Sequence, residues 1–92
     1  MELLERILKE ENIAWVKDGN GYTIDDVGGD IYIEDGEMYF IHGNQTVGVE
    51  LTEPDLDNWI RAYINGFDEF EDYMKKKGWG SYGSDCEYYY LH

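Results

Sequence analysis

The chain has 92 residues, of which 21 are Asp or Glu and seven are Lys or Arg, so its formal net charge at pH 7 is −14. With 42% hydrophobic and 16% aromatic residues it is too apolar for a disordered acidic tail, and its length suits one globular domain. A surface of this charge repels nucleic acid and acidic membranes and attracts basic grooves. The composition therefore argues against direct binding of nucleic acid or membrane, and it predicts a basic protein partner.

Cysteine use and hydropathy indicate the compartment. Cys86 is the only cysteine, so no disulfide can form within the chain, which is compatible with a reducing cytosol. The first residues are charged and amphipathic rather than an apolar signal segment, and no run approaches the roughly 18 apolar residues of a membrane helix. We therefore expect a soluble, cytoplasmic protein.

The first predicted element is a short amphipathic helix that ends near Asn12. Its apolar residues recur at helical spacing among charged neighbours, and they are Leu3, Leu4, Ile7 and Leu8. From Ile13 the apolar residues alternate with polar ones, which is typical of strands. A weaker strand is expected from Ile13 and another at Tyr22–Ile24.

Three stronger strands follow. Asp35-Gly36 is a strong tight-turn signal between strands at 30–34 and 38–42, and Gly43-Asn44 then leads to a strand at 46–51. The alternation of apolar and polar residues continues through all three strands. The pattern predicts an antiparallel meander of three to five strands.

Two helices are predicted after the sheet. Thr52, Pro54 and Asp55 are typical of a capped helix start with Thr52 as the cap. Gly66 is expected to break or kink this helix, and a second helix runs from about Phe67 to Lys77, where Gly78 ends it. In the second helix the acids come first and the lysines last, which is the order that the helix dipole favours.

Together these elements predict an α+β fold with an N-terminal helix, an antiparallel three- to five-stranded meander, two C-terminal helices and a Tyr-rich tail. Residues 1–79 form a single acidic α+β domain, and residues 80–92 form a Gly/Tyr-rich C-terminal tail or a last strand. We expect one face of the sheet to pack on the helices. The other face, with the helix junction, presents acids.

The Asp18–Tyr22 segment resembles the middle of an EF-hand calcium loop. In that register the first and twelfth ligand positions are Val16 and Val27, which supply no side-chain oxygen. We therefore expect a plain hairpin turn here and no metal site.

Catalytic signals are weak along the whole chain. His42 stands at a strand end, and no Ser or Cys has the sequence context of a nucleophile. Carboxylate pairs such as Asp25-Asp26 fall close together by chance in a chain with 21 acids. Gly28-Gly29 does not precede a helix start, so it is not a phosphate-binding loop. We expect a protein that is not an enzyme and has no cofactor.

The acids themselves are the strongest functional signal. Alternate residues of a strand place carboxylates about 6.6 Å apart on one face, so the charges form a rigid array. In the segment 67–73 aromatic residues alternate with acids, and Tyr73 is a candidate interface anchor because Tyr tolerates half-burial. These features favour a charge-mimicking interaction protein over a solvated acidic surface that only maintains solubility.

The order of elements, the motif AYINGF at 62–67 and the following DEFEDYM resemble the small acidic anti-CRISPR proteins of phages and prophages. The resemblance covers about residues 1–79. Members that inhibit the type II CRISPR nuclease share a helix, a three-stranded antiparallel sheet and two further helices. They occupy the basic pocket that reads the target's short DNA tag. The resemblance implies that the partner binds the hairpin and helix acids, which are Glu34, Asp35, Glu37, Asp68, Glu69, Glu71 and Asp72.

The functional hypothesis is a non-enzymatic inhibitor that mimics nucleic-acid charge. It would occupy the basic DNA- or RNA-binding groove of a CRISPR nuclease or another defence protein, through those seven acids and Tyr73. Two alternatives remain open. One is an immunity protein that neutralises a nuclease toxin, and the other is a plain acidic soluble domain.

Overall fold

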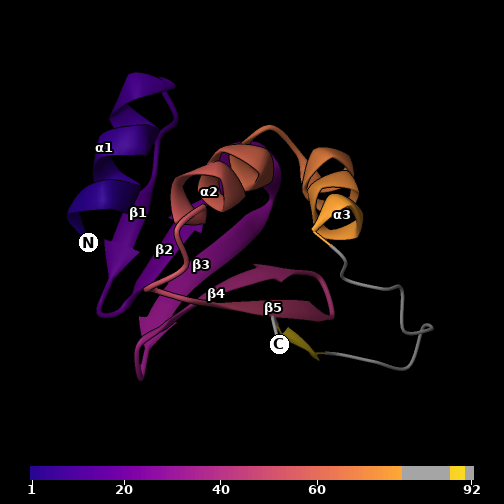
Figure 1. The fold of residues 1–92 in the computed structure, drawn as a ribbon. Helices are drawn as coiled ribbons and strands as arrows, with labels where there is room; N and C mark the ends of the chain where they lie inside the picture. The colour runs from indigo at the N-terminus through magenta and orange to yellow at the C-terminus, as the bar shows by residue number, and fades with distance from the viewer. Residues whose placement is uncertain (78–87, 91–92) are drawn as a thin grey trace.

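The computed structural model describes residues 1–77 and 88–90. Its helices lie against one sheet (Figure 1). The predicted α+β fold is confirmed. The predicted helix end at Gly78, and the predicted tail apart from residues 88–90, lie outside the described residues, as does Cys86. The elements in chain order are α1 (Glu2–Glu10), β1 (Val16–Asp18), β2 (Gly21–Ile24), the 3₁₀ turn η1 (Asp25–Val27), β3 (Gly29–Glu34), β4 (Glu37–His42), β5 (Gln45–Glu50), α2 (Leu56–Ile64), α3 (Phe67–Lys76) and β6 (Tyr88–Tyr90).

The strands form one sheet in sequence order. β1 to β5 are antiparallel neighbours, and β6 lies parallel to β5. Three of the connections are two-residue turns, at Gly19-Asn20, Asp35-Gly36 and Gly43-Asn44. Asp35 and Gly36 both have positive φ, 51° and 79°, which the tightest hairpin turn requires and which the Asp-Gly pair predicts. The predicted meander and the plain hairpin turn after Asp18 are therefore confirmed.

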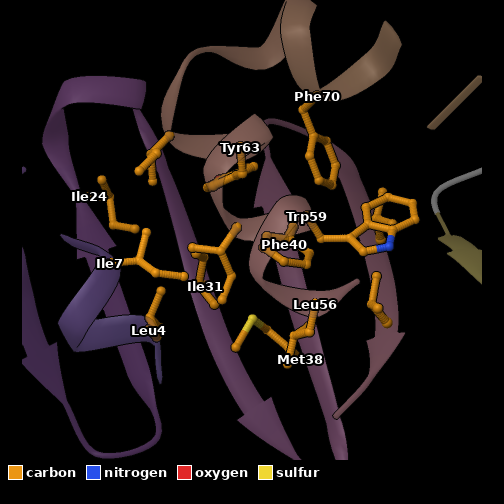
Figure 2. Close-up of a cluster of buried hydrophobic side chains, with 14 of the residues drawn as sticks. Leu4, Ile7, Ile24, Ile31, Met38, Phe40, Leu56, Trp59, Tyr63 and Phe70 are labelled. Carbon is orange, nitrogen blue, oxygen red and sulfur yellow. The ribbon is translucent and has the colours of Figure 1, made fainter. Parts of the chain in front are cut away.

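All three helices cover the same face of the sheet (Figure 1). Alternate strand residues point into the space between sheet and helices, and they meet the apolar stripes of the helices there (Figure 2). Within the described part of the chain no charged side chain is buried. The core side chains labelled in Figure 2 are Leu4, Ile7, Ile24, Ile31, Met38, Phe40, Leu56, Trp59, Tyr63 and Phe70.

Tyr63 fixes α2 against the middle of the sheet. Its ring lies 5.2 Å from the ring centres of both Phe40 and Phe70. Its hydroxyl donates a hydrogen bond to the carbonyl oxygen of Ile41. A Cβ atom at Gly29 would overlap both that hydroxyl and the Ile41 carbonyl oxygen. Only glycine at position 29 allows α2 to approach the sheet this closely, which explains the second glycine of the Gly28-Gly29 pair.

Of the two predicted boundaries of α2, the start differs from the structure and the end agrees with it. The predicted start of α2 at Thr52 is wrong, because the helix begins at Leu56. The Glu53 amide bonds to the Glu50 carbonyl in a turn, and the Asp55 carboxylate binds the Lys77 ammonium instead of capping the helix. The break at Gly66 is confirmed. This residue has φ 126° and ψ 158°, a conformation that is open essentially to glycine alone.

The first strand is also shorter than predicted. It begins at Val16, whereas Ile13 and Trp15 precede it as partly buried residues that pack against the core without pairing in the sheet. Their alternation therefore reflects packing rather than strand structure.

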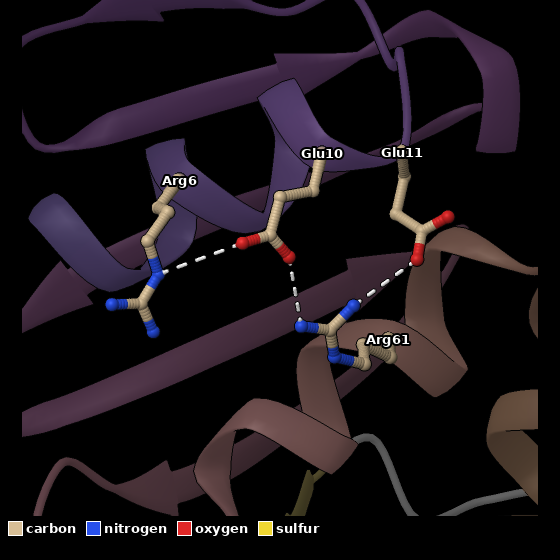
Figure 3. Close-up of polar contacts among 4 residues, drawn as sticks. All are labelled: Arg6, Glu10, Glu11 and Arg61. Atoms are coloured by element: carbon tan, nitrogen blue, oxygen red, sulfur yellow. Dashed lines mark hydrogen bonds and ion pairs between the residues drawn. The ribbon is translucent and has the colours of Figure 1, made fainter.

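Two basic residues connect separate helices. Arg61 of α2 reaches Glu10 at 3.0 Å and Glu11 at 3.1 Å, at the end of α1, and Arg6 adds a 4.0 Å contact to Glu10 (Figure 3). Lys77, at the end of α3, pairs with Asp55 just before α2. Exposed ion pairs are each worth at most about 1 kcal/mol. They orient the helices, and the apolar core supplies most of the stability.

Replacing Trp59 by Ala should lower the free energy of unfolding by about 3 to 5 kcal/mol, because the change leaves a cavity in the core. Trp59 is 0% exposed and makes edge-to-face contacts with Phe70 and Tyr73. Urea unfolding followed by circular dichroism measures the change. The control is Val16→Ala, because Val16 is 62% exposed. A loss below about 1 kcal/mol for Trp59→Ala would contradict the packing described here.

Stability should fall between about pH 10 and pH 12. Burial, with help from a 2.8 Å hydrogen bond donated to Glu5, raises the pKa of Tyr22 to about 12. The phenol of Tyr22 ionises near pH 10 in the unfolded chain but only near pH 12 in the folded protein. The free energy of unfolding therefore falls as the pH rises between these two values. Burial also raises the pKa of Tyr63. Tyr22→Phe should make the decline shallower in alkaline urea titrations, and parallel curves for the two proteins would refute this cause.

Candidate interaction surface

The face of the sheet opposite the helices, here called the open face, carries side chains in rows that the strand register fixes. Thr23, Asp30, Ile41 and Thr46 are aligned across β2 to β5. A second row, with Asp18 on β1, contains Gly21, Tyr32, Tyr39 and Gly48. The third row contains Glu34, Glu37 and Glu50, and we call it the hairpin row. The predicted division of the sheet into a packed and an acidic face is therefore observed.

The hairpin row places like charges directly opposite one another. Glu34 pairs in register with Glu37, and Glu37 pairs with Glu50, so their Cβ atoms are about 5 Å apart. The Tyr39 hydroxyl donates a 2.8 Å hydrogen bond to Glu37 and so holds the central carboxylate in place. In the described part of the chain, none of the three makes an ion pair. Asp35 lies exposed in the adjoining turn.

The predicted acids of α3 divide into two sets. Asp68, Glu69 and Asp72 are exposed, and within residues 1–77 they make no ion pair; we call them the α3 ridge. Glu71 differs because it lies 3.6 Å from the Lys75 ammonium. Tyr73, predicted as an interface anchor, is half-buried, with its ring edge-to-face against Trp59 at 4.9 Å.

The structure does not bring the hairpin row and the α3 ridge together. His42, the last residue of β4, stacks on Phe67 at the start of α3, with ring centres 4.2 Å apart. Glu37, at the first residue of β4, is five residues away along an extended strand, which corresponds to about 17 Å. The hairpin row also lies on the open face, whereas α3 covers the opposite face. The predicted site therefore consists of two separate acidic surfaces.

Sequence reasoning missed three residues that the register places on the open face. Glu50 extends the hairpin row, and Tyr32 and Tyr39 form a stacked pair with ring centres 4.7 Å apart. The signal was available in the sequence. The two-residue turn at 43–44 places His42 opposite Gln45, so each step back along β4 is matched by one step forward along β5, and Glu37 comes opposite Glu50. The turn at 35–36 places Tyr32 opposite Tyr39 in the same way.

Among residues 1–77 and 88–90, no group of three or more His, Cys, Asp or Glu side chains is arranged to hold a metal ion. None of the helices in that part of the chain has the length and apolar character to cross a lipid bilayer. Comparisons of the chain with protein-family models, curated proteins and solved structures found no match. Function is therefore inferred from the geometry of the two acidic surfaces.

Neutralising the hairpin row should stabilise the protein. Opposed like charges on neighbouring strands each cost a few tenths to about 1 kcal/mol, so Glu34→Gln, Glu37→Gln and Glu50→Gln together should raise the free energy of unfolding by about 0.5 to 2 kcal/mol at low salt. Glutamine keeps an oxygen that can accept the Tyr39 hydrogen bond.

The measurement is urea unfolding in low salt and in about 1 M salt, where the gain should largely disappear because screening extends only about 3 Å. A control with the same net charge is Glu2→Gln, Asp25→Asn and Asp26→Asn, all exposed and outside the row. If the control gained as much as the row variant, net charge rather than local repulsion would be the cause.

Proposed function

We propose that this protein is a non-enzymatic inhibitor that mimics nucleic-acid charge and occupies the basic nucleic-acid-binding groove of another protein. The first candidate partner is a type II CRISPR nuclease, which the sequence resemblance suggests. Other defence proteins with basic grooves are further candidates. The hairpin row is the primary contact surface, and the α3 ridge is a second contact. Tyr73 supports α3 through Trp59 rather than serving as a freely exposed anchor.

The observation that carries this proposal is the hairpin row. Three carboxylates stand side by side on adjacent strands with no cation of the described chain between them. Such an arrangement opposes folding, and solubility alone does not require the charges to be adjacent. A basic partner would relieve the repulsion on binding, because its cations would be placed among the carboxylates.

The charge density is also comparable to that of a nucleic acid. Neighbouring strands are about 4.8 Å apart, so the row carries one charge per 4.8 Å, against one per 3.4 Å of axis along each DNA strand. The whole molecule is 33 Å in its longest dimension, and duplex DNA of that length carries about 19 phosphate charges. The chain's net charge of −14 is of the same order.

The decisive experiment is competition for a defined partner. Purified type II CRISPR nucleases, loaded with guide RNA, are mixed with labelled target DNA and increasing amounts of this protein. We expect DNA to be displaced, and we expect the protein's association rate to fall steeply between about 50 and 200 mM salt because exposed charges are screened. An immunity protein would instead leave these nucleases unaffected and block a nuclease toxin in the same assay.

Three variants with equal net charge show which surface is responsible. The first neutralises the hairpin row, the second carries Asp68→Asn, Glu69→Gln and Asp72→Asn on the α3 ridge, and the third is the Glu2, Asp25 and Asp26 control. We expect the first to slow association about tenfold, the second to slow it less, and the control to slow it least. Acids of α1 that bind Arg61 are unsuitable controls because they hold the helices together.

Equal slowing by all three variants would mean that only net charge matters and would refute a specific surface. If no nucleic-acid-binding protein were displaced from DNA, charge mimicry itself would be wrong, and the plain acidic domain would remain as the explanation. Because the row variant is expected to be more stable than the wild type, weaker binding by that variant is not attributable to unfolding.

A further inference from the structure

The outer edge of β5, on the side away from β4, is only partly covered by another strand. β6 lies beside it in parallel and pairs with residues 46–48 (Figure 1). Within residues 1–77 and 88–90, Val49 and Glu50 pair with β4 alone. We call this side of residues 46–50 the β5 edge.

The strand register shows which backbone groups face the β5 edge. His42 and Gln45 close a two-residue turn, and such a closing pair exchanges both of its backbone hydrogen bonds. The direction of the backbone groups alternates along a strand, so Thr46, Gly48 and Glu50 direct their N–H groups away from β4. These groups are available to a strand that lies along the edge.

β6 is a short cover for this edge. It has three residues, and it runs parallel to β5, a pairing that is slightly less stable per residue than the antiparallel one. β5 itself has six residues, Gln45–Glu50. A longer antiparallel strand would form more backbone hydrogen bonds with β5 than β6 does, and it would compete with β6 for the same groups.

The side chains of β5 select the strand that fits best. Glu50 is exposed, and a residue added opposite it would extend the hairpin row on the open face. A Lys or Arg there would face Glu50 directly, whereas an acid would add a fourth like charge to the row. Residues opposite Val47 and Val49 would lie on the packed face, where both valines are buried. The best strand therefore alternates basic and apolar residues.

We propose that the β5 edge is a docking site for an extended basic segment of the partner protein, which adds a strand to the sheet and displaces β6. Backbone hydrogen bonds supply the affinity of such strand addition, and alternate side chains supply its selectivity. A second copy of this chain fits less well, because two molecules with a net charge of −14 repel each other. This assignment rests on the proposed function, since it takes the partner to be basic, and it names the kind of segment that is bound.

The test uses the capped peptide Arg-Val-Arg-Val-Arg, which has one residue for each position of the β5 edge. It is titrated into the full isotope-labelled chain at low salt, and binding is followed by amide chemical shifts. We expect the signals of Thr46, Gly48 and Glu50 to shift, together with those of β6 as it leaves the sheet. The same peptide methylated at alternate backbone nitrogens keeps its charge but cannot pair, so it should bind about tenfold more weakly.

Two pairs of variants test the competing strand and the charge. Tyr89→Pro removes the N–H of the middle residue of β6 and should make the peptide bind about threefold more tightly, whereas its control Tyr89→Ala keeps that N–H. Glu50→Gln should weaken binding about threefold. Its control Glu2→Gln makes the same change in charge at an exposed residue of α1 and should weaken binding less.

Equal binding of the two peptides would overturn strand addition, because charge alone would then explain the binding. Equal affinity of Tyr89→Pro and Tyr89→Ala would overturn the displacement of β6. If Tyr89→Pro formed dimers in light scattering, a second copy would be the occupant and the proposal would be wrong.

These results would leave the DNA competition by the hairpin row intact, because the row variants test it separately. The opposite combination, a peptide that pairs with β5 in a protein that displaces no DNA, would support the docking site and refute the proposed function.

Discussion

The register of the antiparallel sheet is the constraint on which the rest of the structure depends. Two-residue turns allow one pairing only, and a shift by a single residue would move every side chain to the opposite face. The Asp35-Gly36 turn, with both residues at positive φ, sets the pairing of β3 with β4. It therefore decides that Ile31, Met38 and Phe40 face the helices while the hairpin row faces solvent.

A chain with this net charge can fold because its charges and its apolar residues are cleanly separated. The helices meet the sheet through aromatic and aliphatic side chains, and the ring contacts of Phe70 with Phe40, Trp59 and Tyr63 connect α3 and α2 to the sheet. Two of the seven basic residues lie where helices meet. Arg61 neutralises the acids at the end of α1, and Lys77 neutralises Asp55 before α2. Among the described residues no carboxylate is buried.

Most of the fold could be predicted from the sequence because local signals and packing agree. The Asp-Gly turn, the apolar stripe of α2 and the break at Gly66 each follow from one local rule. The start of α2 could not be predicted in this way. Lys77, 22 residues farther along the chain, competes for the Asp55 carboxylate, and a local capping rule does not include such a partner. The alternation of Ile13 and Trp15 also predicted a strand wrongly, since both residues pack against the core and such packing can imitate strand alternation.

The candidate site was predictable in its residue types but not in its arrangement. The sequence singled out Glu34, Asp35 and Glu37, and counting across the turns adds Glu50. It could not show that the α3 ridge lies on the other side of the molecule, because that depends on how α3 packs through Phe67 and Phe70. The roles of individual glycines also needed the structure, since Gly21 and Gly29 look alike in the sequence but have different surroundings.

The two acidic surfaces differ in how firmly they hold their charges. Under the proposed function, this difference makes the open face the better candidate for the main contact. In the hairpin row three backbones are held by the sheet, and Tyr39 fixes the central carboxylate, so little freedom is lost when a partner binds. The α3 ridge carries its charges on exposed side chains of a helix that follows a glycine break, and ordering those side chains opposes binding. If the proposed function holds, the same repulsion favours binding, because basic side chains of the partner would be placed between the opposed glutamates and would relieve it.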